Sequence, residues 1–283
     1  MSIVEKFNAK EVAYSIIRSN DNSAPPFPYL RDNLGNKIMT CISPHHGRSF
    51  VVSEQDGRYI VSKGNGLSYT QYTHLNSREF GDYTWGLLLE DDAVRDFDIG
   101  IEVHDLGIKT NIMQYVIKLE TEICLATGHI LSPILLQYSV ECPYRICDAA
   151  YMSKDEIWKQ VAMWERYNKK GYSQSYLIAA EVLINNLKIL HENKILHNAI
   201  HPQNYTWALE LLDFEISCSP KHPYKKDSHF VADLYPREII QTYDIINHIA
   251  SCLNESIDHA VLEDLFLRYG FDIKHCNSIY AYS

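Results

Sequence analysis

Two polar side chains in the second half of the sequence could hold a divalent cation. Asn204 ends a polar loop, and Asp213 follows it nine residues later, after the apolar run Trp207–Leu212. If that run folds back as a tight hairpin, the amide and carboxylate oxygens lie side by side. Hard oxygen ligands of this kind bind Mg²⁺, which in turn bridges the phosphates of ATP. The spacing therefore predicts a magnesium and ATP site at Asn204 and Asp213, and the alternative is a polar loop without a ligand.

A loop asparagine, an apolar hairpin and an aspartate, in this order, form the metal clamp of the protein-kinase fold. That fold also uses a strand lysine, oriented by a glutamate on a helix, to neutralise phosphate charge. Lys63 in YIVSKGNGL ends a predicted strand, and Gly64 and Gly66 follow it as a small turn beside the cofactor. Glu79 in NSREF is the predicted partner of Lys63. The alternative for Lys63 is a solvated lysine at a strand end.

The elements that would position these residues divide the chain into a strand-rich half and a helical half. Two β-prone runs around an Asp-Gly turn predict a hairpin, and apolar stripes at helical spacing predict the later helices. Ser153 and Glu156 form a capping box at the start of one of them. Strands are predicted at 50–53, 58–61, 113–119 and 134–140, and helices at about 91–106, after Ser153, and at 174–191, 236–253 and 258–269.

These elements predict an α+β, two-lobed protein-kinase-like fold. Residues 1–35 are interpreted as an N-terminal extension, helical at first and then a Pro-rich connector, because three prolines lie within residues 22–28. Residues 36–145 would form the N-lobe, a mixed sheet with a helix. Residues 146–283 would form the helical C-lobe with the metal-binding loop. In that loop we expect His197 to hydrogen-bond the backbone rather than bind zinc.

Composition limits the classes of partner. The chain has 283 residues and a formal charge of 26 − 36 = −10, which argues against nucleic acid and anionic membranes as partners. No apolar run is long enough to span a membrane, and the N-terminus lacks the apolar core of a signal peptide. The seven cysteines form no CxxC pair, so we expect reduced thiols in a cytoplasmic protein.

Three segments within residues 45–215 resemble the selenoprotein O family, namely KGNGLSYTQYTHLNSREF, HDLGIKT and HNAIHPQNYTWALELLDFE. The resemblance implies a kinase-like fold that binds ATP in a flipped orientation and transfers AMP to protein hydroxyl groups. Asn204 and Asp213 fall on the family's two metal-binding positions without a gap. Arg145, in PYRIC, lies near the family's phosphate-binding arginine, so it would neutralise a terminal phosphate.

The sequence departs from that family in its loop. Gln203 stands where the family has an aspartate, and Glu215 stands where it has glycine. About 18 extra residues precede HDLGIKT, so Glu102 is the alternative partner of Lys63. The same loop is similar to that of small-molecule kinases, and Ala199 stands at the position of their catalytic aspartate.

We therefore expect an ATP–Mg²⁺ transferase that passes AMP, or else phosphate, to a hydroxyl of a protein or small molecule. Neither comparison supplies a carboxylate base, so transfer would be slow. The alternatives are a small-molecule kinase, a catalytically inactive pseudokinase that serves as a binding or scaffold module, and an unrelated α+β interaction protein.

Overall fold

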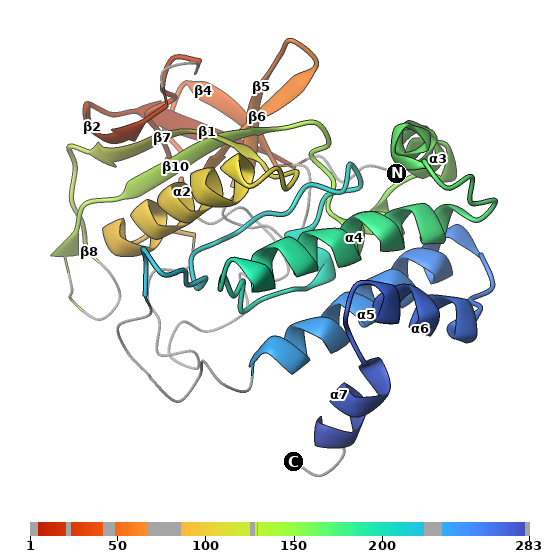
Figure 1. The fold of residues 1–283 in the computed structure, drawn as a ribbon. Helices are drawn as coiled ribbons and strands as arrows, with labels where there is room; N and C mark the ends of the chain where they lie inside the picture. Colours follow the sequence, from red (N-terminus) through yellow and green to blue (C-terminus); the bar gives the residue numbers. More distant parts are fainter. Residues whose placement is uncertain are drawn as a thin grey trace.

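An eight-stranded antiparallel sheet forms the N-terminal part of the computed structural model, and helices form the rest (Figure 1). The structure describes residues 5–20, 24–41, 49–66, 86–124, 128, 130–223 and 234–280. The strand order is β2-β7-β10-β6-β5-β4-β1-β3. The bounds are β1 Glu5–Glu11, β2 Tyr14–Ser19, β3 Tyr29–Arg31, β4 Lys37–Cys41, β5 Ser49–Gln55, β6 Arg58–Lys63, β7 Ile112–Leu119 and β10 Ile134–Val140; a separate ribbon pairs β8 Ile123–Cys124 with β9 Ile130–Leu131.

The hairpin of β5 and β6 is the central feature predicted from the sequence, and it is confirmed. Gln55 pairs with Arg58 across a two-residue turn. Asp56 and Gly57 in that turn have φ of 51° and 73°, as a type I′ turn requires, and Asp and Gly tolerate such values. Because the turn fixes the register, Lys63 falls at the end of β6, next to β10.

The N-terminal segment was predicted to be helical, and that prediction is wrong. β1 and β2 are strands of the main sheet, so the predicted extension, residues 1–35, contributes three of its strands. The reason is an alternation in EKFNAKE: Phe7 and Ala9 point to the same face, where they pack with Met39 and Phe50. A period of two buries one face of a strand, whereas a helix would have scattered these side chains.

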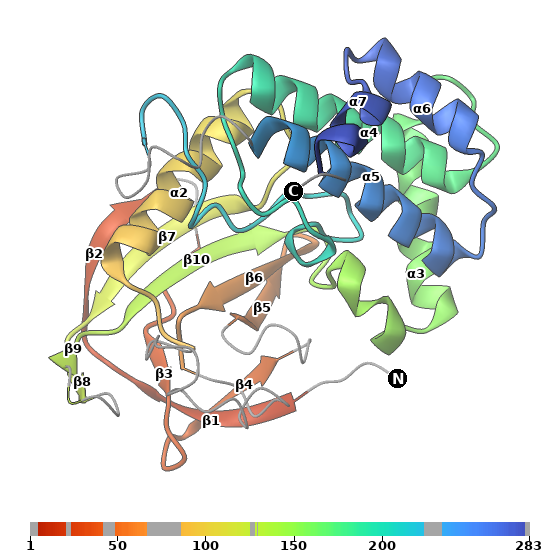
Figure 2. The same ribbon diagram turned by 90° about the horizontal axis from the view of Figure 1, so that it is seen from below.

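Helix α2 (Glu90–Asp105) lies along β7 and β10, as Figure 2 shows from below. Its apolar stripe includes Ala93, Phe97 and Val103, all buried in the main core. The predicted helix at 91–106 is thus confirmed, and its position over the sheet brings one helix face next to the end of β6.

The C-terminal part is helical, as predicted. Ser153 Oγ accepts the Glu156 N–H at 3.2 Å and the Glu156 carboxylate accepts the Ser153 N–H at 2.7 Å, so the predicted capping box starts α3. Helix α4 packs against α5 in one core shared with α2 and the sheet. The bounds are η2 Ile146–Tyr151, α3 Lys154–Ala162, η3 Met163–Tyr167, α4 Ser175–Glu192, η4 Pro202–Asn204, α5 Leu234–Leu253, α6 His259–Arg268 and α7 Ile273–Tyr280.

The main sheet and helix α2 form the first lobe, and the later helices form the second. This two-lobed α+β arrangement confirms the predicted fold class. The chain passes from β10 to η2 through residues 141–145, the connection between the lobes, which we call the hinge. Within the described residues, no helix is both long enough and apolar enough to cross a membrane.

Candidate functional site

The buried lysine at the end of β6 is the centre of the site. Lys63 is only 2% exposed, and its Nζ donates hydrogen bonds to Asp96 Oδ2 at 3.0 Å and to Asp213 Oδ1 at 2.9 Å. Glu215 Oε1 lies 2.7 Å from the same nitrogen. A strand, helix α2 and the segment after the C-lobe hairpin therefore converge on one ammonium group. A buried ammonium requires such partners, because desolvation without them is costly.

Asp96 is the most deeply buried member of this cluster, at 1% exposure. Its Oδ1 accepts the Phe214 N–H at 2.9 Å, so the side chain joins α2 to the segment that carries Asp213. Burial raises the pKa of Asp96 to about 6; Lys63 opposes that shift, and the neighbouring carboxylates of Asp213 and Glu215 add to it. Lys63 is therefore the cation that favours the ionised form of Asp96.

Among the described residues, the helix partner of Lys63 is Asp96, which was not predicted from the sequence. The Glu102 alternative is wrong: its carboxylate accepts from Ser219 Oγ at 2.8 Å and lies 3.5 Å from Lys221 Nζ. Glu79, the preferred prediction, lies outside the described residues. A signal for Asp96 was present, because it shares the apolar stripe of α2, and an acid on a buried helix face needs a cation or a donor.

The loop that carries Asn204 is joined to Asp213 by a short hairpin, as predicted. The Leu212 N–H donates to the Asn204 carbonyl at 2.9 Å, and Tyr205 bridges Leu211 in antiparallel fashion. Asp213 then takes a φ of 69°, a left-handed conformation that aspartate tolerates better than most residues. The hairpin brings the backbones of the two candidate metal ligands to neighbouring positions.

The side chain of Asn204 is held on both sides of its amide. Its Nδ2 donates to the Ala199 carbonyl at 2.9 Å, and its Oδ1 accepts from Arg145 at 3.3 Å. Arg145 also donates to the Gln203 carbonyl at 2.6 Å and is 6% exposed. The arginine predicted to meet a terminal phosphate therefore contacts the loop that carries Asn204 and fixes the orientation of that side chain.

The two glycines after Lys63 form a packed turn. Gly64 has a φ of 99°, and a Cβ there would lie 2.3 Å from the Ile134 carbonyl oxygen. Gly66 has a φ of 101° and donates its N–H to the Gly86 carbonyl at 2.8 Å. Asn65, between them, donates to the Tyr29 carbonyl at 2.5 Å. These contacts join the end of β6 to β3, and the positive φ values explain why glycine occupies both positions.

His197 has the structural role predicted for it. The ring is fully buried and its Nε2 lies 2.9 Å from the Leu212 carbonyl oxygen. Burial lowers the pKa of His197, so the imidazole is neutral and donates that hydrogen bond. It holds the loop start against the residue that precedes Asp213.

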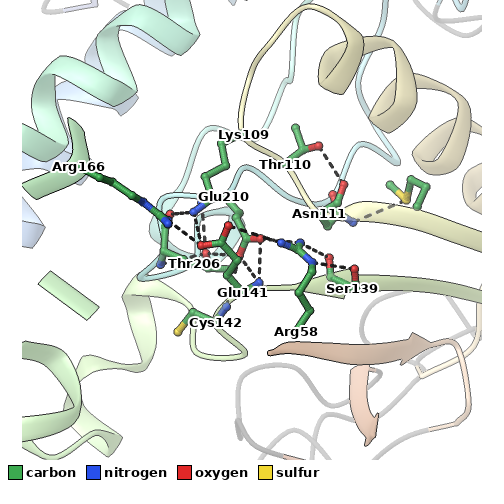
Figure 3. A network of polar contacts seen from close by, with 12 residues as sticks. Arg58, Lys109, Thr110, Asn111, Ser139, Glu141, Cys142, Arg166, Thr206 and Glu210 are labelled. Carbon is green, nitrogen blue, oxygen red and sulfur yellow. Dashed lines mark hydrogen bonds and ion pairs between the residues drawn. The ribbon is translucent and has the colours of Figure 1, made fainter. Parts of the chain in front are cut away.

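A network of polar contacts fixes the hinge to the hairpin (Figure 3). Glu210, in the hairpin, is completely buried, and its carboxylate accepts from the Glu141 N–H at 2.9 Å and from Thr206 Oγ1 at 3.0 Å. Arg58, at the start of β6, donates from Nη2 to Glu210 Oε1 at 3.0 Å. Arg166 reaches Glu141 from the helical lobe at 2.6 Å. Both lobes are therefore anchored to the element that carries Asn204 and Asp213.

A small cavity lies between the lobes beside this hinge. Its volume is about 30 Å³, and its lining includes Val51, Val61, Val140, Cys142 and Leu212. Apolar side chains from both lobes suit the flat face of a nucleobase. The volume is far below the roughly 300 Å³ of a typical ligand site, so a nucleotide would require the lobes or side chains to separate.

Comparison with known proteins adds little to this geometry. No family model matches the sequence, and no curated protein matches it. Among solved structures, the crystal structure of a Toxoplasma gondii specific rhoptry antigen kinase domain is similar over 82% of this chain and 76% of that chain, with 11% identity and a TM-score of 0.34. A TM-score of this size marks a loose likeness in shape.

The internal geometry is more specific than that likeness. A lysine ends a strand of the N-lobe hairpin, a carboxylate on the next helix pairs with it, and an Asn–Asp hairpin follows a long C-lobe helix. Protein kinases arrange these parts in the same order. The fold is protein-kinase-like.

Proposed function

We propose that this protein binds ATP with Mg²⁺ between its lobes and transfers AMP or phosphate, slowly, to a hydroxyl group of a protein or small-molecule acceptor. The observation that carries the proposal is the buried Lys63, within 3.0 Å of both Asp96 and Asp213. In kinases the strand lysine must be paired with its helix carboxylate, and the metal-binding aspartate must stand beside it, before transfer can occur.

The residues present suit a magnesium ion and a nucleotide. Asp213 offers a carboxylate oxygen, and carboxylate oxygens of Asp96, Asp213 and Glu215 lie within 4.8 Å of one another. Asn204 offers an amide oxygen from the adjacent loop, which Arg145 holds in place. Bound magnesium would supply charge neutralisation for the phosphates, and Lys63 would add a positioned positive charge.

Slow transfer follows from the residues of the loop. Gln203 and Ala199 occupy the two positions at which the similar families carry an aspartate, and neither side chain can accept a proton at neutral pH. Loss of a general base costs roughly 10²–10⁴-fold in rate, while positioning and charge are retained. AMP transfer in preference to phosphate transfer is supported by the resemblance to selenoprotein O alone. We also propose a cytoplasmic location and partners that are neither nucleic acid nor membranes.

A second candidate, a pseudokinase that acts as a binding module, is favoured by the small interlobe cavity of about 30 Å³. A site that stays closed in solution would not take up a nucleotide, and the fold would then serve to present its surface to a partner.

Thermal-shift titration with ATP, with and without Mg²⁺, separates these candidates. We expect ATP to raise the melting temperature in Mg²⁺, and Asp213→Ala to remove most of that shift because a metal ligand is lost. Asp98→Ala is the control, since Asp98 lies on α2 and pairs with Arg18 at 3.1 Å rather than with Lys63. α-Labelled and γ-labelled ATP then distinguish AMP transfer from phosphate transfer. No shift with ATP under any condition would contradict nucleotide binding.

A further inference from the structure

We propose that the Glu215 carboxylate is an internal competitor of nucleotide phosphate, which caps Lys63 and must move away before a phosphate can reach that ammonium. This inference rests on the proposed function and concerns the regulation of the same site. It starts from the contact between Glu215 Oε1 and Lys63 Nζ, which at 2.7 Å is the shortest of the three carboxylate contacts to that nitrogen.

The geometry of the ammonium explains why a phosphate and Glu215 compete. Lys63 donates hydrogen bonds to Asp96 and Asp213, and an ammonium has three N–H donors in all. Glu215 approaches the same nitrogen as an ion pair. A phosphate oxygen is also an anion that seeks this nitrogen, so the two oxygens cannot both take the place nearest to it.

Of the three carboxylates, Glu215 is the one able to leave. Asp96 is 1% exposed and is also held by the Phe214 N–H, so its position is fixed from two sides. Asp213 belongs to the proposed metal site. Glu215 has the longest side chain of the three and lies in a turn closed by the hydrogen bond from Ser217 N–H to the Phe214 carbonyl at 3.0 Å. Rotation about its side-chain bonds would carry the carboxylate away from Lys63.

The charges in the cluster favour the same conclusion. One ammonium and three carboxylates sum to +1 − 3 = −2, and an incoming polyphosphate adds further negative charge. Repulsion between like charges a few ångströms apart is strong in a partly buried site. Movement of Glu215 into solvent removes one of these charges from the path of the phosphates.

The test compares ATP affinity of the full chain with that of Glu215→Gln, which keeps the shape and removes the charge. We expect the variant to bind ATP roughly tenfold more tightly, with and without Mg²⁺, as the loss of one partly buried like charge predicts. Glu102→Gln is the matched control, since Glu102 contacts Ser219 and Lys221 instead. Unchanged affinity would overturn the proposal. Weaker binding confined to Mg²⁺ would also overturn it, because Glu215 would then be a metal ligand.

A second measurement does not depend on nucleotide. Acetic anhydride acylates accessible amines, and peptide mass spectrometry reports each lysine separately. We expect Glu215→Ala, at unchanged melting temperature, to raise the acylation rate of Lys63 several-fold while that of Lys109 stays constant. Faster acylation of Lys63, together with no ATP binding by any variant, would support the contact between Glu215 and Lys63 and contradict the proposed nucleotide binding. Unchanged acylation would overturn the cap itself.

Discussion

Glu210 and Glu141 belong to one polar network, yet we expect their removal to have different consequences for stability. Glu210 is completely buried, whereas the Glu141 side chain is 25% exposed. Glu210→Ala should lower the free energy of unfolding by about 3 kcal/mol, because it strands buried donors. Glu141→Ala should lower it by about 1 kcal/mol or less, since its ion pairs are partly solvated.

The larger figure follows from the partners of Glu210. Its carboxylate accepts from the Glu141 N–H, Thr206 Oγ1 and Arg58 at 2.9, 3.0 and 3.0 Å. Each buried donor left without a partner costs about 1–3 kcal/mol. Two corrections reduce the sum. Burial raises the pKa of Glu210, so the ionised carboxylate is itself costly and its removal returns part of that cost. Arg58 is 23% exposed and keeps its bonds to Ser139 Oγ and O at 3.0 Å.

Urea unfolding of the wild type and both variants measures the two costs, with the slope of the transition checked for two-state behaviour. A double-mutant cycle with Arg58→Met isolates the ion pair from the backbone bond to Glu141. Equal losses for Glu210→Ala and Glu141→Ala would refute the reasoning, because burial would then not decide the value of a contact in this network.

Three further predictions concern the turn after Lys63, the missing base and the pH dependence of stability. Gly64→Ala should cost about 3 kcal/mol in chemical unfolding, because its Cβ would meet a carbonyl oxygen at 2.3 Å, whereas Gly107→Ala, at φ 85° in open space, should cost about 1 kcal/mol. Gln203→Asp should raise the rate of AMP transfer if the selenoprotein O register is correct, and Ala199→Asp should raise phosphate transfer if the small-molecule kinase register is correct; unchanged label transfer in both would place the base elsewhere. Burial raises the pKa of Glu141, but hydrogen bonds from Lys109 and Arg166 lower it, and the net pKa lies below the ordinary 4.5. The contribution of the ionised Glu141 to the free energy of unfolding is therefore complete above about pH 4.5 and is lost as the pH falls through the lowered pKa. The stability difference between wild type and Glu141→Gln should accordingly shrink in acid and stay constant from about pH 5 to 8.

Local patterns predicted most of the elements, because each depends on residues close in sequence. The Asp56-Gly57 turn fixes its own backbone conformation and hence the register of β5 and β6. Ser153 and Glu156 cap α3 within a single turn of helix. The first strand escaped prediction for the opposite reason: β1 gains its stability from pairing with β3 and β4 and from packing on Met39 and Phe50, none of which is adjacent to it in sequence.

The choice of partner for Lys63 shows where local patterns stop. Glu102 was judged by neighbouring sequence, but a contact between a strand and a helix depends on how that helix is rotated over the sheet. Ala93 and Phe97 face the core, and that rotation turns Asp96 inward and carries Glu102 toward Ser219. The deciding quantity is therefore the helix phase.

The same phase explains why an aspartate can take the place expected for a glutamate. Asp96 is shorter by one methylene, and its carboxylate still reaches Lys63 at 3.0 Å while also accepting the Phe214 N–H. A side chain that bonds both elements leaves little freedom between α2 and the segment carrying Asp213. An Asp96→Glu substitution would add a methylene at a site that is 1% exposed, where extra volume is poorly tolerated. The short acid is therefore a requirement of close packing between helix and loop, and Lys63 is positioned by that packing as much as by charge.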